Sequence, residues 1–229
     1  MKLLSNKDFK DISEELGIEQ ALLRTVAEVE SGKAGFLGDG RPVILFEAHI
    51  FSNLTNHKYD ESNPNISSRT WNKKLYKGGT KEYDRLIEAS KINKAIALKS
   101  ASWGKFQIMG FNYNKCGYNS IFDFADDMYT SEKKHLNAFI KFIKHENIIQ
   151  YLIAKNWKEF ARRYNGPRYL DNKYDTKLEI AYNKYKNLYP IAVVTTEVPN
   201  ITNIIEPEIN KRLGIIEIII DLWRKLWQK

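Results

Sequence analysis

The sequence has one cysteine, Cys116, so no disulfide can form within the chain. A single thiol cannot build a zinc or iron site, and the four histidines are dispersed without the spacing of metal ligands. We therefore expect no metal and no other cofactor. Cys116 itself is expected to be buried as a small apolar side chain.

Long apolar runs are lacking as well. No stretch of about 18 uncharged apolar residues exists that would span a membrane. Residues 1–11 contain too short an apolar stretch for a signal peptide. We expect a protein that is made in the cytoplasm without a signal peptide and that acts there or is moved by other means.

What is present is an apolar fraction of 43% with 13% aromatic residues, enough for a sizeable core. The net charge of +8 is carried before residue 190, because five basic and five acidic residues follow residue 189. A basic surface suits a polyanion such as nucleic acid, anionic lipid or bacterial cell wall. Charge alone does not choose among them, and no recognised motif supports nucleic-acid binding.

Local patterns divide the chain into elements. Ser5 is a predicted N-cap, and Gly17 separates the first two helices. Asp39-Gly40, flanked by apolar residues, predicts a hairpin turn. Residues 52–79 are polar and predict an extended loop. Further helices are predicted over residues 80–98, 120–147, 148–163 and 170–188.

Glu30 is the most informative residue. A helix is predicted over residues 18–32, and at about 100° per residue Glu30 falls on the same side as Leu23 and Val26. Glu28 points to solvent on this geometry. Burial and the negative end of the helix dipole both raise the pKa of a carboxyl group. Such a group suits a general acid near neutral pH, as glycoside cleavage requires.

Glu47 is a second carboxylate of interest. In a strand, Leu45 and Glu47 would share a face, and the apolar neighbours of Glu47 predict that it is partly buried. It is either the second carboxylate of a glycosidase pair or a structural partner of Arg41 or His49.

Residues 100–110 (SASWGKFQIMG) form another candidate site. Gly104 allows close approach of the backbone to a ligand. Trp103 or Phe106 would stack on a sugar face, and Gln107 would hydrogen-bond a hydroxyl or acetamido group. The alternative is a tight turn into a buried segment.

Tyr164-Asn165 precedes Gly166-Pro167 at the end of a predicted helix. Asn-Gly followed by proline is an ordinary helix exit. The functional alternative places Tyr164 and Asn165 on the wall of a cleft.

Taken together, these motifs resemble the lysozyme-like superfamily in its goose-lysozyme and lytic-transglycosylase branch. More closely, the chain resembles the N-acetylmuramidase family of phage endolysins and related bacterial proteins, over about residues 5–189. The stretches that carry the resemblance are residues 26–32, 35–37, 39–42 and 44–47, then Ser102-x-Gly104-x-x-Gln107 and Tyr164-Asn165. One departure is Ala48, where the family pattern has a basic residue before the histidine.

The resemblance implies a mainly α fold of the α+β class: a lysozyme-like helical domain with a small β-hairpin element. It implies that Glu30 protonates the β-1,4 bond between N-acetylmuramic acid and N-acetylglucosamine of peptidoglycan. The expected substrate-binding residues are Ser31, Ser102, Trp103, Gly104, Phe106, Gln107, Tyr164 and Asn165.

The step after protonation is open. Attack by water gives hydrolysis, whereas attack by the muramic acid 6-hydroxyl gives a 1,6-anhydro product and needs only one carboxylate. A second carboxylate, for which Glu47 and Asp39 are the candidates, favours hydrolysis. We predict a phage-type muramidase that acts on the cell wall after release or delivery, with no nucleic-acid partner. The alternatives are a lytic transglycosylase and a non-catalytic module that binds wall or membrane.

The chain is predicted to consist of a domain over residues 1–189, a proline-containing linker over 190–208, and an amphipathic C-terminal helix over 209–229. In residues 213–229, isoleucine, leucine and tryptophan recur on one face, with mixed charges opposite. This helix docks onto the domain or self-associates, or else it binds an anionic membrane surface through its two tryptophans.

Overall fold

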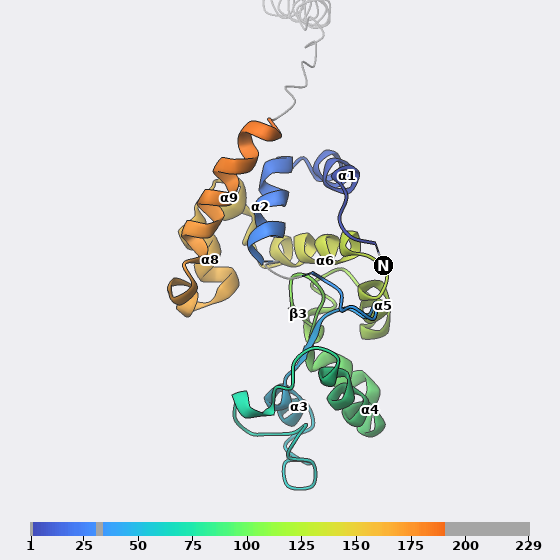
Figure 1. Ribbon diagram of the computed structural model, residues 1–229. Helices are drawn as coiled ribbons and strands as arrows, with labels where there is room; N and C mark the ends of the chain where they lie inside the picture. The colour runs from blue at the N-terminus through green and yellow to red at the C-terminus, as the bar shows by residue number, and fades with distance from the viewer. Residues whose placement is uncertain (1, 31–33, 191–229) are drawn as a thin grey trace, which may run out of the picture. The chain divides into compact units, whose positions relative to one another are not determined.

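The structure, a computed structural model, describes residues 2–30 and 34–190 (Figure 1). The described residues up to Pro190 belong to one compact unit. The predicted C-terminal helix, and the predicted linker beyond Pro190, lie outside the described residues. No helix in the described part of the chain combines the length and apolar character needed to cross a membrane.

The first helix, α1 (Asn6–Leu16), has the boundaries that its sequence predicts. The Ser5 hydroxyl accepts a hydrogen bond from the Asp8 N–H, and the Asp8 carboxylate accepts one from the Ser5 N–H. This reciprocal pair satisfies two N–H groups that a helix start leaves without partners. Gly17 ends the helix in the left-handed conformation at φ 63°, where glycine is unstrained.

Helix α2 (Gln20–Glu30) begins two residues later than predicted but shows the predicted faces. Leu23 and Val26 are fully buried, whereas Glu28 is exposed. Helix α9 (Tyr174–Leu188) packs along α2, and its side chains hydrogen-bond to Glu28. The 3.6-residue periodicity therefore oriented this helix correctly.

The chain forms three short strands, β1 (Ile44–Phe46), β2 (Ala101–Trp103) and β3 (Ile108–Met109). They make an antiparallel sheet in the order β1-β2-β3. Ile44 pairs with Trp103, and Ser102 pairs with Met109.

The predicted hairpin is only partly correct. Its turn at Asp39-Gly40 exists, and Phe36 bridges Pro42 across it. The strand after the turn, however, pairs with β2 rather than with residues 36–37. The local turn pattern does not reveal this partner, because β2 lies more than fifty residues along the chain.

The predicted loop from residue 52 begins inside a helix, α3 (Ala48–Leu54). Glu47 is the N-cap of α3 and not a strand residue, so the strand interpretation of Glu47 was wrong. A 3-10 turn, η1 (Lys73–Leu75), interrupts the remaining loop before α4 (Lys81–Lys99). Helix α4 is kinked at Asn93, whose φ of −156° and ψ of 106° are not helical.

A buried ion pair joins α4 to β1 and to the loop. The Glu82 carboxylate lies 2.9 Å from Arg85 Nη1, and both side chains are almost fully buried. Glu82 also accepts backbone hydrogen bonds from Phe46, Lys77 and Gly78 at 3.2, 2.6 and 2.9 Å. One side chain on α4 thus binds both the loop just before this helix and the distant strand β1.

In Figure 1, helix α6 (Glu132–His145) lies in the middle of the molecule. The helices α1, α2, α8 (Trp157–Asn165) and α9 form an upper group, and the sheet, α3 and α4 form a lower group. The predicted helix 120–147 is divided, because Ser131 begins a new helix as an N-cap. Asn156 caps α8 in the same way and divides the predicted helix 148–163. The helices concerned are α5 (Ile121–Met128), α7 (Ile149–Ile153) and α8 (Trp157–Asn165).

Candidate active site

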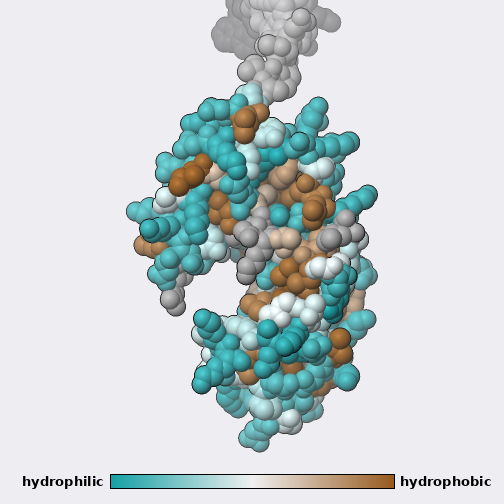
Figure 2. Space-filling model, viewed as in Figure 1, coloured by the Kyte–Doolittle hydropathy of each residue, from teal (hydrophilic) through white to brown (hydrophobic). Residues whose placement is uncertain are grey.

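Two adjoining cavities border the turn between β2 and β3, one toward the end of α2 and the other toward α8, on the side where Figure 2 shows the surface hollowed. The first, which we name the Val29 cavity, has a volume of about 420 Å³. Val29 and Ala34 line it from the α2 side, and Leu45 and Gly78 line it from the other. The walls of this cavity therefore come from both the upper group of helices, through α2, and the lower group, through β1.

Glu30 is the last residue of α2 and stands between two residues that line this cavity, Val29 and Ala34. Its backbone is therefore at the cavity, at the C-terminal end of a helix whose partial charge is negative. Ser31 lies outside the described residues. The burial of the Glu30 carboxylate stays a prediction.

Gln107 occupies the border between the two cavities, because it lines both. It sits in the turn between β2 and β3 with a φ of 48°. Its Oε1 accepts a hydrogen bond of 2.9 Å from the Ser102 hydroxyl, and its Nε2 donates to the Gly104 carbonyl at 2.7 Å. Ser102 is thus buried as a support for Gln107, whose exposed amide remains beside the cavity.

The backbone at Gly104 does approach another group closely, but that group is the side chain of His135. Gly104 has a φ of 67°, and a Cβ atom built there would lie 2.7 Å from His135 Nδ1. A Cβ atom built on Gly35 would lie 2.8 Å from the same nitrogen. His135 therefore brings the segment after α2 and the β2–β3 turn together on α6, and Gly104 lines the Val29 cavity beside it.

The hydrogen bonds of His135 fix its neutral form. Nδ1 accepts from the Lys105 N–H at 3.1 Å, so Nε2 must carry the proton that it donates to the Met128 carbonyl at 2.7 Å. Burial lowers the pKa of His135. Glu132, one turn earlier, accepts from the N–H groups of Gly35 and Leu4, which hold its pKa below the ordinary value although burial opposes this.

Two predicted sugar-stacking residues are core residues. Trp103 is 1% exposed, and its indole N–H donates to the Leu98 carbonyl. Phe106 is 4% exposed and stacks on Phe139 at 4.6 Å between centroids. The Trp103 ring is enclosed in the core, so the alternative of a tight turn into a buried segment describes Trp103. Phe106, although nearly buried, is one of the residues that line the second cavity, and its contact with a sugar stays a prediction.

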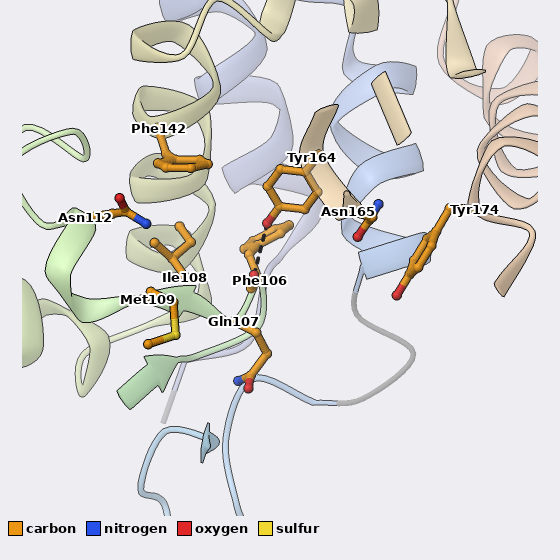
Figure 3. Close-up of a pocket in the computed structure, with 9 residues that line it drawn as sticks. All are labelled: Phe106, Gln107, Ile108, Met109, Asn112, Phe142, Tyr164, Asn165 and Tyr174. Atoms are coloured by element: carbon orange, nitrogen blue, oxygen red, sulfur yellow. Dashed lines mark hydrogen bonds between the residues drawn. The ribbon is translucent and has the colours of Figure 1, made fainter. Parts of the chain in front are cut away.

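Tyr164 and Asn165 also line the second cavity, which we name the Tyr164 cavity. Its volume is about 410 Å³. The Tyr164 hydroxyl donates to the Phe106 carbonyl at 3.0 Å, and Figure 3 shows Tyr164 pointing toward the turn while Asn165 lies between it and Tyr174. Gln107 and Tyr174 line both cavities, so the two form one continuous candidate site.

Glu47 lies two residues beyond Leu45, a residue of the Val29 cavity, and its side chain is 14% exposed. Its Oε2 accepts a hydrogen bond of 2.5 Å from the Tyr76 hydroxyl and lies 3.3 Å from His49 Nδ1. Burial and the Glu47 hydrogen bond raise the pKa of Tyr76, which keeps this phenol protonated as a donor.

Asp39 and Arg41 pair with each other. Two guanidinium N–H groups of Arg41 donate to Asp39 Oδ2 at 2.9 and 2.7 Å. These hydrogen bonds lower the pKa of Asp39. Arg41 is therefore the partner of Asp39, and His49 is the neighbour of Glu47.

Comparison with known proteins identifies the group to which this site belongs. The sequence model of the N-acetylmuramidase family matches residues 19–186. The chain belongs to the N-acetylmuramidase family. It is also similar to the crystal structure of the Burkholderia AP3 phage endolysin, with 39% identity and a TM-score of 0.76. That match covers 81% of this chain and 73% of the endolysin. Among curated proteins, none matches the sequence.

The family and this neighbour make the protein a peptidoglycan glycoside hydrolase with an endolysin-like fold. Glu30 and the predicted cleft residues fall inside the matched range of the muramidase model. The described part of the chain holds no group of three or more His, Cys, Asp or Glu that would bind a metal ion. Cys116 is buried, as predicted, and burial raises its pKa to about 12.

Several residues at this muramidase site were missed by sequence reasoning. Tyr174 and the Gly78-Gly79 pair line the Val29 cavity, and Tyr76 holds Glu47. The glycine pair had a signal, because adjacent glycines leave the backbone open to a ligand. Tyr174 begins a helix with an ordinary surface pattern, and its role depends on how α9 packs.

Proposed function

We propose that the protein is an endolysin-type muramidase whose general acid is Glu30. It cleaves the β-1,4 bond between N-acetylmuramic acid and N-acetylglucosamine in the bacterial cell wall. The observation that carries this proposal is the position of Glu30 at the end of α2, where Val29 and Ala34 line a cavity that is open to a glycan. The family membership supports the same substrate.

Glu30 protonates the leaving glycosidic oxygen and so makes the bond labile. The negative end of α2 favours the protonated, neutral form of this carboxyl group. A muramidase then needs a carboxylate that activates water on the opposite side of the sugar. We assign this role to Glu47, because Asp39 is held in an exposed ion pair with Arg41.

Sugar binding is assigned to the continuous site formed by both cavities. The Gln107 amide, held by Ser102, faces hydroxyl and acetamido groups at the border of the cavities. Tyr164 and Asn165 contribute the wall of the Tyr164 cavity. Gly104 keeps the β2–β3 turn close to His135 and so sets the position of Gln107. Ser31 completes the predicted set from the sequence motif.

The test is a digest of purified peptidoglycan with the wild type and with Glu30→Gln, which keeps the shape of the side chain but removes the acid. Mass spectrometry of the soluble products reads the result. Reducing muramic acid ends from the wild type alone support the muramidase with Glu30 as its acid. Anhydro-muramic ends would make it a lytic transglycosylase and remove the need for Glu47. Binding of the wall without any product would leave a non-catalytic module.

We further propose, from the sequence alone, that residues 213–229 bind an anionic membrane surface. The pattern that supports this is the apolar face with Trp223 and Trp227 near a basic end. Sedimentation of the full chain with phosphatidylglycerol vesicles, compared with Trp223→Ala/Trp227→Ala, tests the proposal. Equal binding by both proteins would refute it.

A further inference from the structure

The stretch of chain that leads into α4 is basic. Residues 62–81 contain five lysine and arginine residues and no aspartate or glutamate. Lys73, Lys74 and Lys77 are exposed, whereas Arg69 lies 3.4 Å from Asp60. Three exposed lysines therefore lie within five residues of the chain.

An exposed tryptophan accompanies these charges. Trp71 is 59% exposed, the highest value among the large exposed aromatic side chains of the described residues. Its ring lies 6.1 Å from that of Tyr76, at an interplanar angle of 60°. A tryptophan with so much of its surface in water gains little from packing within the protein, so its free face is available to a ligand.

The segment is held firmly rather than left loose. The Tyr76 hydroxyl is bound by Glu47, and the N–H groups of Lys77 and Gly78 are bound by the buried Glu82. The Asn72 side chain caps η1 by accepting from the Lys74 N–H at 3.0 Å. The exposed side chains therefore stand on a preorganised backbone, which reduces the entropy lost on binding.

The segment also continues directly into the candidate site. Gly78 and Gly79 line the Val29 cavity, one and two residues after Lys77. In Figure 1 the turquoise η1 segment forms the left edge of the lower part of the molecule. A polymer that leaves the cavity past Gly78 and Gly79 would meet this segment next along the chain.

We propose that Trp71, Lys73, Lys74 and Lys77 form a subsite that binds glycan strands carrying peptide stems. One sugar ring stacks on Trp71, and the ammonium groups bind carboxylates of the peptide stems attached to the muramic acid units. The proposal rests on the proposed function. It assigns to this muramidase a preference for peptide-substituted strands over bare ones.

The test compares two substrates and two charge variants of the full chain. The substrates are intact peptidoglycan and the same material freed of its stems by an amidase. Because amidase cleavage leaves a lactyl carboxylate on each muramic acid, these carboxylates are then capped as methylamides, so that the stem-free glycan carries no carboxylate. The variants are Lys73→Ala/Lys74→Ala and, as a control of equal charge, Lys7→Ala/Lys10→Ala on α1, whose lysines form exposed pairs with Asp11 and Glu14. Binding is measured by cosedimentation in the Glu30→Gln background, and turnover in the wild-type background.

We expect Lys73→Ala/Lys74→Ala to raise the KM and weaken cosedimentation roughly threefold to tenfold on intact peptidoglycan. On stem-free glycan the same variant should behave like the α1 control, with kcat unchanged on both substrates. Added salt should reduce the difference, since exposed charges are screened. Trp71→Ala should weaken binding of both substrates, because stacking needs only the sugar.

Equal weakening on both substrates, or no weakening beyond that of the α1 control, would overturn the proposal. Binding of wall teichoic acid or anionic vesicles in place of stem-bearing glycan would overturn it as well. The readout by binding does not depend on chemistry. If the wild type released no muramic acid ends at all, the proposed function would fail separately.

Discussion

The Tyr76 hydroxyl donates a 2.5 Å hydrogen bond to Glu47 Oε2, and this contact ties the basic segment to the start of α3. The same carboxylate is our candidate for activating water. Glu47 therefore has two proposed roles, one as the base and one as the anchor of Tyr76. Two conservative substitutions test these roles separately.

Glu47→Gln keeps an oxygen that accepts from Tyr76 but removes the basic carboxylate. If Glu47 activates water, kcat should fall by about 100-fold or more. Tyr76→Phe removes the anchor alone and should cost less than about tenfold. Rates of reducing-end release on peptidoglycan measure both, with Asp39→Asn as a control that retains activity. Equal losses in the two variants would leave Glu47 as an anchor only.

Gly104→Ala should destabilise the protein by about 2–4 kcal/mol, since it combines positive-φ strain with overpacking. The new Cβ atom would lie 2.7 Å from His135 Nδ1. Gly40→Ala is the matched control, because Gly40 has a φ of 85° but no atom within 4 Å of an added Cβ. Guanidinium unfolding measures the free energy of each variant. A Gly104→Ala protein as stable as Gly40→Ala would contradict the close packing against His135.

Glu82→Gln should cost about 3 kcal/mol, because it leaves the buried Arg85 without its charge partner. It also turns an amide N–H toward backbone groups that already donate to Glu82. The exposed Asp84→Asn on the same helix should change stability by less than about 0.5 kcal/mol. Unfolding midpoints compare the two. If the losses were similar, Glu82 would not be the link between α4, β1 and the loop.

Local patterns predicted the elements whose signals lie within a few residues. The Ser5 cap, the Gly17 stop and the buried face of α2 are examples, because capping and helical periodicity act over one or two turns. Helical periodicity also pointed to Glu30 at the end of α2, whose role as the acid stays a prediction. The family match supports the function that this residue suggested.

What the sequence could not predict depends on contacts between distant segments. Trp103 is buried because β2 pairs on both sides and its indole N–H meets the Leu98 carbonyl. Tyr76 reaches Glu47, and Glu82 reaches Phe46, only because the loop before α4 folds back onto β1. Local alternation placed Glu47 in a strand, whereas the chain turns into α3 at that residue.

The stability of the protein should depend on pH through His135. In the folded protein His135 is neutral, with Nε2 as donor and Nδ1 as acceptor, and burial holds its pKa below the unfolded value of about 6.5. Between these two pKa values the unfolded chain binds more protons than the folded one. The contribution of His135 to the free energy of unfolding is therefore fully present above about pH 6.5, and it is lost as the pH decreases toward the folded pKa. Lys105 and Glu132 face the ring, and Glu132 stays charged throughout this window because its pKa is lowered.

His135→Gln should therefore be less stable than the wild type at pH 8, and the gap should narrow as the pH falls from 7 to 5. Glutamine retains one donor and one acceptor but does not titrate. Guanidinium unfolding at several pH values measures the gap, and the subtraction removes the contributions that the other histidines make to both proteins. A gap that stays constant over this range would mean that His135 titrates equally in the folded and unfolded states. The neutral ring would then not be what holds Gly35 and Gly104 together beside the cleft.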